Sequence, residues 1–538
     1  MSRGLTRRAA LAAPLALAAC RSGAPVAFDG GWLGASHERG HRLRDAAAFV
    51  PDTTRRCAVV VVGAGVAGLA AARALQRAGI DDVQVFELED EAGGNARGHT
   101  MAGMACPLGA HYLPLPGPDA REVGEWLHEI GLLRNVAGRT VPDERHLSHS
   151  PQERLWVEGQ WLDGLLPPAE RGSAREHHYQ RFSQLVTQAS RTLRFTIPSH
   201  RAGWGAGHAA LDALTFAHWL DRQGLDDPAL RWFLDYSCRD DYGADSTAVS
   251  AWAGLQYFAS RHGFQAPGEA AAPEREAVFT WPEGNAWLTR KLAAPLGERL
   301  HTGALVGRIE AMRHEVAIDV LRHVPTPRNE RWLAQQVVMA LPLHVATRVV
   351  AQPPAVLTQS GAQMTYAPWL VANLHLRSPL TDKPGAPPSW DNVVYAPGTN
   401  TLALGYVDAM HQSLRPVPGP TVLTAYWALG HGGRETLARQ RQSLLDEPWS
   451  VWSRRVVDDL ARAHPDLPAK TARVDLMRYG HAMAIPAPGV RGSAALLALR
   501  QPTTSRLHFA HADLAGYSIF EEAFTLGDAA GRAAAKRL

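Results

Sequence analysis

The stretch CAVVVVGAGVAGLAAARALQRAGIDDVQVFELEDEAGGNARG, residues 57–98, decides the fold. Its apolar, valine-rich run at 58–62 predicts a parallel strand that is buried on both faces. The alanine-rich sequence that follows predicts a helix up to Ala78, and Gly79 is placed to end it. A second apolar run at 83–86 predicts the next strand. Together these elements indicate a strand–helix–strand unit of an α/β fold.

Three glycines, Gly63, Gly65 and Gly68, lie between the first strand and the helix in the spacing GxGxxG. The first allows a tight turn, the second allows the backbone to approach a pyrophosphate, and the third allows the helix to pack on the strand. The N-terminus of the helix then offers free N–H groups to the phosphates. Glu87, at the end of the second strand, is placed to accept hydrogen bonds from a ribose. The stretch therefore predicts a dinucleotide site, for which NAD and FAD share the fingerprint.

The residues after Glu87 favour FAD over NAD. The sequence Gly93-Gly94-Asn95-Ala96-Arg97 resembles the second glycine-pair motif, usually Gly-Gly-Arg, of the flavin-containing amine oxidase and phytoene desaturase superfamily. This chain departs from the motif by inserting Asn95 and Ala96 before the arginine. The resemblance implies that FAD is the cofactor and that Arg97 reaches a phosphate.

Later segments resemble the same family in the same order, so that the resemblance spans about 58–538. The segments 279–285 and 337–342 resemble the parts of the family's sequences in which the chain enters the flavin domain for a second time. In the strand edge at 306–309, the family's pattern implies that the backbone of Val306 meets the adenine. In the closing turn and at the start of the final helix, it implies flavin contacts from Asp513 and from the backbone of residues 519–522, which includes Glu522.

These placements predict two domains with interleaved segments. We expect a discontinuous Rossmann-like FAD-binding domain with an α+β substrate domain, whose sheet roofs the flavin. The FAD-binding domain is assigned to residues 53–115, 275–345 and 495–538, and the substrate domain to residues 116–274 and 346–494. Within the substrate domain, apolar spacing predicts helices at 121–133, 215–223 and 249–258 and strands at 370–376 and 421–427.

The N-terminus resembles an export signal. Residues 1–20 have an arginine-containing start, with Arg7-Arg8 as in twin-arginine signals, and an apolar run too short to cross a bilayer. The end of this segment, Leu17-Ala18-Ala19-Cys20, resembles a bacterial lipobox. We therefore expect the twin-arginine translocase as a partner, a lipid anchor at Cys20 and a location at the periplasmic face of the cell envelope. Residues 21–52 have no clear period and are expected to form a tether.

Composition excludes several other classes. The 538 residues are 46% hydrophobic and 20% charged, which is an ordinary globular balance. Lys+Arg minus Asp+Glu is 55 − 52 = +3, and no polybasic arm is present, so no nucleic-acid partner is expected. The four cysteines form no CxxC pair, and no metal site is expected.

The catalytic residues are less clearly marked than the cofactor site. Many family members carry a lysine that holds a water near the flavin, and the strand that resembles theirs, 369–376, has none. Asn373 or His375 could hold that water, although both could be ordinary strand positions. Tyr517 lies close to where the family places an aromatic side chain. His481 could accept a proton, or could bind backbone in a turn.

Further polar and aromatic residues are candidates for the substrate cavity. His111 and Tyr112 follow the first flavin segment, where the family's chain passes the isoalloxazine. The segments 390–392 (Trp-Asp-Asn) and 405–412 are rich in side chains that bind cations through carboxylates and aromatic faces. The same residue types also occur at ordinary strand ends.

The sequence thus predicts an exported FAD-dependent oxidoreductase that oxidises an amine to an imine, a polyamine being one candidate substrate. Its electron acceptor could be oxygen, a quinone or a cytochrome. Two alternatives remain open: a desaturase or isomerase of an apolar substrate, favoured by a long cavity without carboxylates, and a non-catalytic lipoprotein that keeps flavin structurally.

Overall fold

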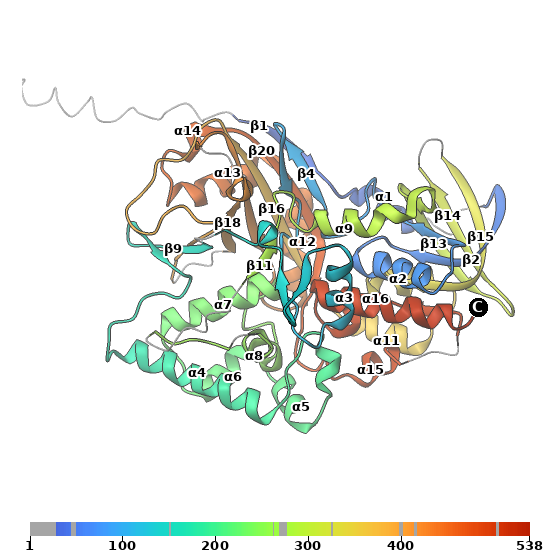
Figure 1. The fold of residues 1–538 in the computed structure, drawn as a ribbon, viewed down its shortest axis with the longest axis horizontal. Coiled ribbons are helices and arrows are strands. Elements are labelled where there is room, and N and C mark those ends of the chain that lie inside the picture. Colours follow the sequence, from blue (N-terminus) through green and yellow to red (C-terminus); the bar gives the residue numbers. More distant parts are fainter. Residues whose placement is uncertain are drawn as a thin grey trace, which may run out of the picture.

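A computed structural model gives the fold of the chain (Figure 1). It describes residues 28–44, 50–149, 152–261, 263–267, 277–323, 327–397, 402–413, 417–501 and 505–538. The expected signal peptide at 1–20, with Cys20, lies outside the described residues.

One half of the molecule is built on a seven-stranded sheet in the order β12-β3-β2-β15-β14-β13, with β21 paired to β15. The central strands β3, β2, β15 and β21 are parallel. Helix α16 packs against α2 so closely that a Cβ on Gly527 would lie 2.0 Å from the carbonyl oxygen of Ala67. This confirms the predicted strand–helix–strand unit. Its elements are β2 (Thr53–Val62), α2 (Val66–Arg77), β3 (Val83–Phe86), β12 (Leu300–His301), β13 (Ala304–Ala311), β14 (Val316–Arg322), β15 (Arg328–Met339), β21 (Leu507–Phe509) and α16 (Phe520–Ala535).

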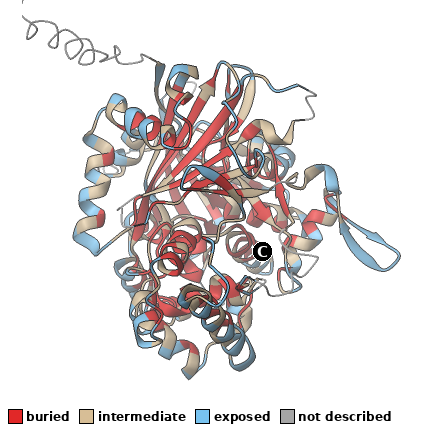
Figure 2. Ribbon diagram, turned by 90° about the vertical axis from the view of Figure 1, so that its left-hand side faces the viewer, coloured by how far each residue is buried: buried red, intermediate tan, exposed pale blue. Residues whose placement is uncertain are grey.

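The other half contains an eight-stranded sheet in the order β1-β20-β16-β19-β18-β17-β9-β10. Figure 2 shows buried residues concentrated along its strands. The strands are β1 (Asp29–Leu33), β9 (Glu153–Val157), β10 (Gln160–Asp163), β16 (Tyr366–Leu376), β17 (Asp391–Val394), β18 (Ala403–Asp408), β19 (Thr421–Ala428) and β20 (Thr471–Ala484). The strands predicted at 370–376 and 421–427 are thus present as parts of β16 and β19.

Helices cover both halves. The predicted helices at 121–133, 215–223 and 249–258 are present, with slightly different ends, as α3 (Arg121–Glu129), α6 (Phe216–Arg222) and α8 (Ala251–Ala259). The others are α1 (His37–His41), α4 (Ala174–Thr192), α5 (Ala206–Asp212), α7 (Pro228–Tyr242), α9 (Ala286–Ala293), α10 (Leu343–Val349), α11 (Ala355–Gln363), α12 (Arg434–Asp446), α13 (Trp449–Ala461), α14 (Leu467–Lys470) and α15 (Ala494–Leu499). Three short antiparallel pairs complete the fold: β4 (Gly98–Met101) with β5 (Met104–Pro107), β6 (Tyr112–Pro114) with β11 (Val278–Thr280), and β7 (Leu133–Val136) with β8 (Arg139–Pro142).

The prediction of a tether over 21–52 is wrong for its described part. Residues 29–33 form β1, which pairs in parallel with β20 from Asp29 opposite Arg473 to Leu33 opposite Met477. The sequence missed this strand because its partner lies more than 400 residues away in the chain. The segment therefore belongs to the folded body.

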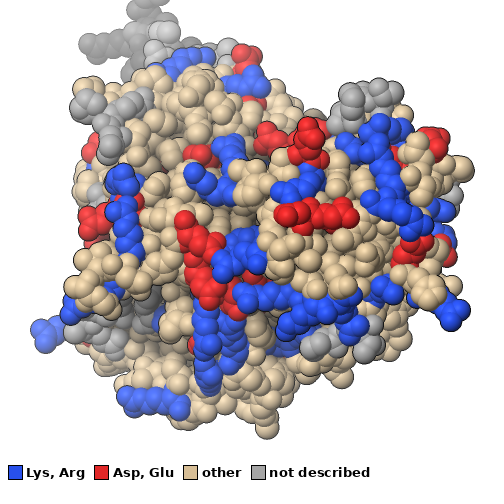
Figure 3. Space-filling view, turned by 45° about the vertical axis from the view of Figure 1, so that its right-hand side comes forward, with Lys and Arg blue, Asp and Glu red and all other residues tan. Residues whose placement is uncertain are grey.

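Two surface properties complete the description. On the face in Figure 3, basic side chains form a band across the lower part and adjoin acidic side chains above it. Within the described residues, no helix combines the length and the apolarity that crossing a bilayer requires.

Candidate active site

A cavity of about 1460 Å³ lies between the two sheets. It begins at the glycine turn after β2, with Gly63 and Gly65, and continues past Tyr112 to Asp240 and Asp391. The predicted dinucleotide site therefore shares one cavity with His111, Tyr112 and Asp391.

The glycine turn is open toward this cavity. Gly65 is the N-cap of α2 and provides no side-chain cap, so that the first N–H groups of the helix are left for a ligand. A Cβ on Gly65 would have its nearest neighbour 3.9 Å away, at Gly94 Cα. Gly93 forms a bridge with Gly65, and both lie in the cavity wall. Gly68 lies behind the turn, where its α-carbon packs on the Gly63 carbonyl. This arrangement fits a pyrophosphate.

Glu87 is fixed at the end of β3. Its carboxylate accepts hydrogen bonds from Ala64 N at 2.8 Å and from Glu89 N at 3.0 Å. Burial raises the pKa of Glu87, while these hydrogen bonds oppose the rise. Val306 lines the same part of the cavity, as the family pattern implies. The held carboxylate and the adjoining strand edge fit the ribose and adenine of FAD.

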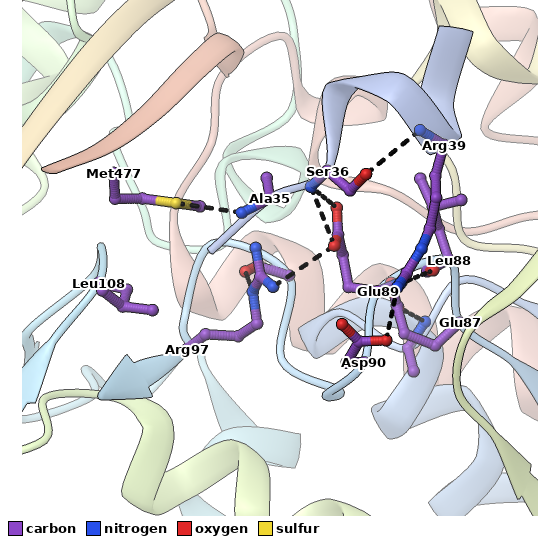
Figure 4. A network of polar contacts seen from close by, with 12 residues as sticks. Ala35, Ser36, Arg39, Glu87, Leu88, Glu89, Asp90, Arg97, Leu108 and Met477 are labelled. Carbon is purple, nitrogen blue, oxygen red and sulfur yellow. Dashed lines mark hydrogen bonds and ion pairs between the residues drawn. The ribbon is translucent and has the colours of Figure 1, made fainter. Parts of the chain in front are cut away.

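Arg97 lines the cavity, but its guanidinium is already engaged. Its Nε donates to the Gly94 carbonyl at 3.1 Å, and its Nη1 lies 3.9 Å from a Glu89 oxygen (Figure 4). A phosphate contact from Arg97 would therefore be shared with these partners.

The far end of the cavity is acidic. Asp240 on α7 and Asp391 on β17 line it, and Tyr112 Oη donates to Asp240 at 3.3 Å. Among the described residues neither carboxylate forms an ion pair, whereas the adjacent Asp241 lies 2.8 Å from Arg261. Burial, followed by the charge of Asp241, raises the pKa of Asp240 to about 7, and burial raises that of Asp391 well above its usual range. This end therefore favours a cationic ligand.

Aromatic rings surround these carboxylates. His111 stacks on Tyr426 with 4.4 Å between ring centroids, and burial lowers the pKa of His111 to about 3. Its imidazole is thus neutral at working pH. The other aromatic side chains in this part of the cavity wall are Tyr236, Trp369 and Tyr406.

A second polar cluster lies where β20 and η6 (Ala512–Ala515) approach the cavity. His481 stacks on His344 with 4.7 Å between centroids, and burial, then the neighbouring His344, lower the pKa of His481. Asp513 lines the cavity and accepts hydrogen bonds from Leu343 N at 2.8 Å and from the Tyr366 hydroxyl. The predicted residues His481 and Asp513 are thus both in the cavity wall.

Besides Gly68, four predicted site residues have side chains that do not line the cavity. Asn373 donates to the Pro107 carbonyl at 3.0 Å and accepts from Thr424, because the end of β5 covers this part of β16. His375 lies two residues further along the same strand.

Tyr517 and Glu522 bond to each other at 3.0 Å and are buried behind the start of α16. Ile519, two residues after Tyr517, takes the place at the cavity wall. The prediction that Asn373, His375 and Tyr517 contact the substrate or the cofactor is therefore wrong for their side chains. The predicted flavin contact from the backbone at 519–522 stays a prediction, and Ile519, Phe520 and Glu521 line the cavity.

The sequence reasoning missed Asp240 and Asp241, and it included Glu521 only as part of the backbone at 519–522. Asp240 and Asp241 lie in the last turn of α7, where the helix dipole disfavours acidic side chains. Such an unfavourable placement was the available signal of a functional role. Glu521 lines the cavity at the start of α16, and burial raises its pKa to about 7. Within the described residues no group of three or more metal-ligating side chains occurs.

Comparison with known proteins decides the family. The model for flavin-containing amine oxidoreductases matches residues 66–537. The chain belongs to the flavin-containing amine oxidoreductase family. The predictions of FAD as cofactor and of an oxidoreductase are thereby confirmed, and the glycine turn and Glu87 are the residues that fit the cofactor.

Individual relatives of this amine oxidoreductase are distant. A Mycobacterium tuberculosis protein named as a flavin-containing monoamine oxidase is 29% identical over 267 residues, 49% of this chain and 53% of that protein. Putrescine oxidase of Kocuria rosea is 31% identical over 198 residues, 35% of each chain. The matches thus span about half, or less, of these curated relatives.

Solved structures share the fold. Putrescine oxidase bound to putrescine matches with a TM-score of 0.63 at 16% identity, over 89% of this chain and 99% of that chain. Cyclohexylamine oxidase from Brevibacterium oxydans matches with a TM-score of 0.63 at 18% identity, over 89% and 99%. These likenesses confirm the predicted fold class.

Proposed function

We propose that this protein oxidises a cationic amine to an imine, with diamines and polyamines as the preferred class. The observation that carries the proposal is the pair Asp240 and Asp391, which lies in the same cavity as the FAD cradle without an ion-pair partner among the described residues. Bound FAD supplies the hydride acceptor.

The chain's own residues would bind and orient the amine. An ammonium group between the two carboxylates supplies the opposite charge that these buried groups lack in the ligand-free protein. The faces of the tyrosine and tryptophan rings add cation–π attraction. A diamine can leave one ammonium there while its other amine lies toward the flavin. The neutral His111 beside the path adds no positive charge that would repel the substrate.

Adding a diamine to the purified holoprotein without oxygen should bleach the flavin band. We expect the mono-N-acetyl derivative of the same diamine to bleach it at least about tenfold more slowly, because the derivative lacks the second charge. Equal rates for the two compounds would contradict the role of the carboxylates. A flavin band that no mono-, di- or polyamine bleaches would contradict amine oxidation itself.

The alternative functions fit this cavity less well. Desaturation or isomerisation of an apolar substrate calls for a cavity without carboxylates, and this one contains Asp240, Asp391 and Glu521. A non-catalytic flavin lipoprotein would leave the flavin oxidised in the same experiment, even with an artificial electron acceptor present.

We also propose that the protein is exported as a folded, FAD-loaded chain and anchored through Cys20. The support is the twin-arginine pair Arg7-Arg8 and the lipobox ending at Cys20. Cys20→Ser should move the protein from the membrane fraction to the soluble fraction of the envelope, measured by immunoblot. Replacing Arg7-Arg8 by Lys-Lys should retain it in the cytoplasm. Unchanged fractions in both variants would contradict the proposal.

A further inference from the structure

The segment 28–44 lies along the wall of the FAD cavity. Ala35, Ser36, His37, Gly40, His41, Leu43 and Arg44 all line the cavity. This segment precedes residue 66, where the match to the family model begins. It also precedes β2, the first strand of the FAD-binding half, and we call it the N-terminal strap.

One end of the strap is fixed to the substrate-side sheet. Strand β1 extends that sheet by pairing with β20. Trp32 stacks against the guanidinium of Arg478 at 4.5 Å, and Ala35 N donates to Met477 Sδ at 3.3 Å. These contacts hold the strap at the edge of the cavity.

The other end of the strap is fixed to the FAD-binding half, at the loop after β3. Ser36 N donates to both oxygens of Glu89, at 3.1 and 3.2 Å (Figure 4). Arg39 donates to the Leu88 carbonyl at 3.2 Å and lies 2.8 Å from Asp90. The strap thus connects the two halves of the molecule beside the ribose-binding Glu87.

These contacts also govern the charge beside the cofactor. Glu89 is largely buried next to Glu87, and FAD brings two phosphate charges to the same region. The Ser36 N–H and the Arg39 and Arg97 guanidiniums offset the charges of Glu89 and Asp90.

We propose that the N-terminal strap gates FAD: Ser36 and Arg39 are positioning residues that hold the strap over the cavity, so that FAD passes only while the strap is undocked. Docking then slows both entry and release of FAD, because each step waits for the open state. This inference depends on FAD binding but not on the amine substrate.

Stopped-flow measurement on the full-length chain tests the gate. FAD release would be followed by the fluorescence of free FAD after dilution of holoprotein, and FAD binding by its quenching on deflavinated protein. For Arg39→Ala we expect both rate constants to rise about fivefold to tenfold, since a charge-assisted bond and a partly exposed ion pair are lost. Ser36→Pro/Arg39→Ala should raise both further.

The joint rise of both rate constants separates a gate from a simple loss of cofactor contacts. Faster release with unchanged or slower binding would overturn the proposal, as would rate constants equal to those of the parent. Flavin that stays on the acid-precipitated chain would also overturn it, because a covalent cofactor needs no gate. Glu38→Ala is the matched control: Glu38 is exposed on the same helix, and we expect both rate constants to be unchanged. Circular dichroism verifies that each variant is folded.

Discussion

Asp240→Asn is expected to lower kcat/KM for a diamine about 100-fold, because a charge-assisted contact to a buried ammonium is worth about 1.5–3 kcal/mol. The Tyr112 hydroxyl can still donate to the amide oxygen, so the geometry of the cavity is kept. Steady-state kinetics with a diamine and an artificial electron acceptor measure the effect. For the mono-N-acetyl derivative the loss should be smaller, since that substrate has no second charge to place.

The pH dependence gives this prediction a second readout. With its pKa raised to about 7, Asp240 is protonated below neutral pH and no longer attracts a cation. The kcat/KM of the parent should therefore fall as the pH drops through about 7. In Asp240→Asn this acidic limb should move to lower pH, because Asp240 is one of the charges that raise the pKa of Asp391.

Stability distinguishes the loss of a charge from damage to the fold. Because the pKa of Asp240 is higher in the folded chain, its favourable contribution is full below the unfolded value of about 3.8 and is lost as the pH rises through about 7. At pH 8 the buried charge destabilises the ligand-free protein, so Asp240→Asn should melt at the same temperature or higher. Asp221→Asn, at an exposed acid paired with Arg231, is the control and should keep full kcat/KM. An unchanged kcat/KM in Asp240→Asn would contradict the cation site.

The cofactor half could be predicted from the sequence because its signals are local. The valine run of β2, the glycine turn, α2 and β3 follow one another within about thirty residues, and each is fixed by its own residues. Glu87 directly follows β3 in the structure, at the place where the sequence predicts the ribose contact. The structure adds the partners of the carboxylate, which come from the turn itself.

The substrate end could not be predicted in the same way, because it is assembled from distant parts of the chain. Tyr112, Asp240 and Asp391 come from β6, α7 and β17, and only the fold brings them together. The sequence did indicate Tyr112 and the Trp-Asp-Asn segment as candidates from residue type alone. It also placed Asn373 on a strand of the roof sheet, but it had no information that β5 covers that end of the strand.

The strap shows the same limit at the N-terminus. Its sequence has no period, and β1 forms only because β20 offers a strand edge to pair with. Sequence reasoning therefore assigned a tether where the chain has a strand and a helix. The contact between Ser36 and Glu89 depends on that pairing, since the strand brings Ser36 to the loop after β3.

The three glycines of the turn should differ sharply when each is replaced by alanine. Gly65 has φ −73°, which any residue adopts, and its Cβ would meet no protein atom closer than 3.9 Å. Gly65→Ala should therefore fold as well as the parent in the absence of FAD, yet bind FAD about 100-fold more weakly, because the new methyl group occupies the space of the pyrophosphate. Isothermal titration of deflavinated protein measures the affinity, and thermal melting measures the fold.

Gly68→Ala should disrupt folding itself, before any effect on FAD binding can be measured. Its Cβ would lie 1.8 Å from the Gly63 carbonyl oxygen, which belongs to rigid backbone and cannot move aside without opening the turn. We expect a loss of at least about 3 kcal/mol in the free energy of unfolding, or no soluble protein, whether or not FAD is present. Gly124→Ala, in α3 with no neighbour within 4 Å, is the matched control and should be neutral or slightly stabilising. Gly65→Ala could instead destabilise the FAD-free chain as much as Gly68→Ala does. In that case, packing within the protein alone would explain why both positions need glycine. The open space above Gly65 would then have no connection with the cofactor.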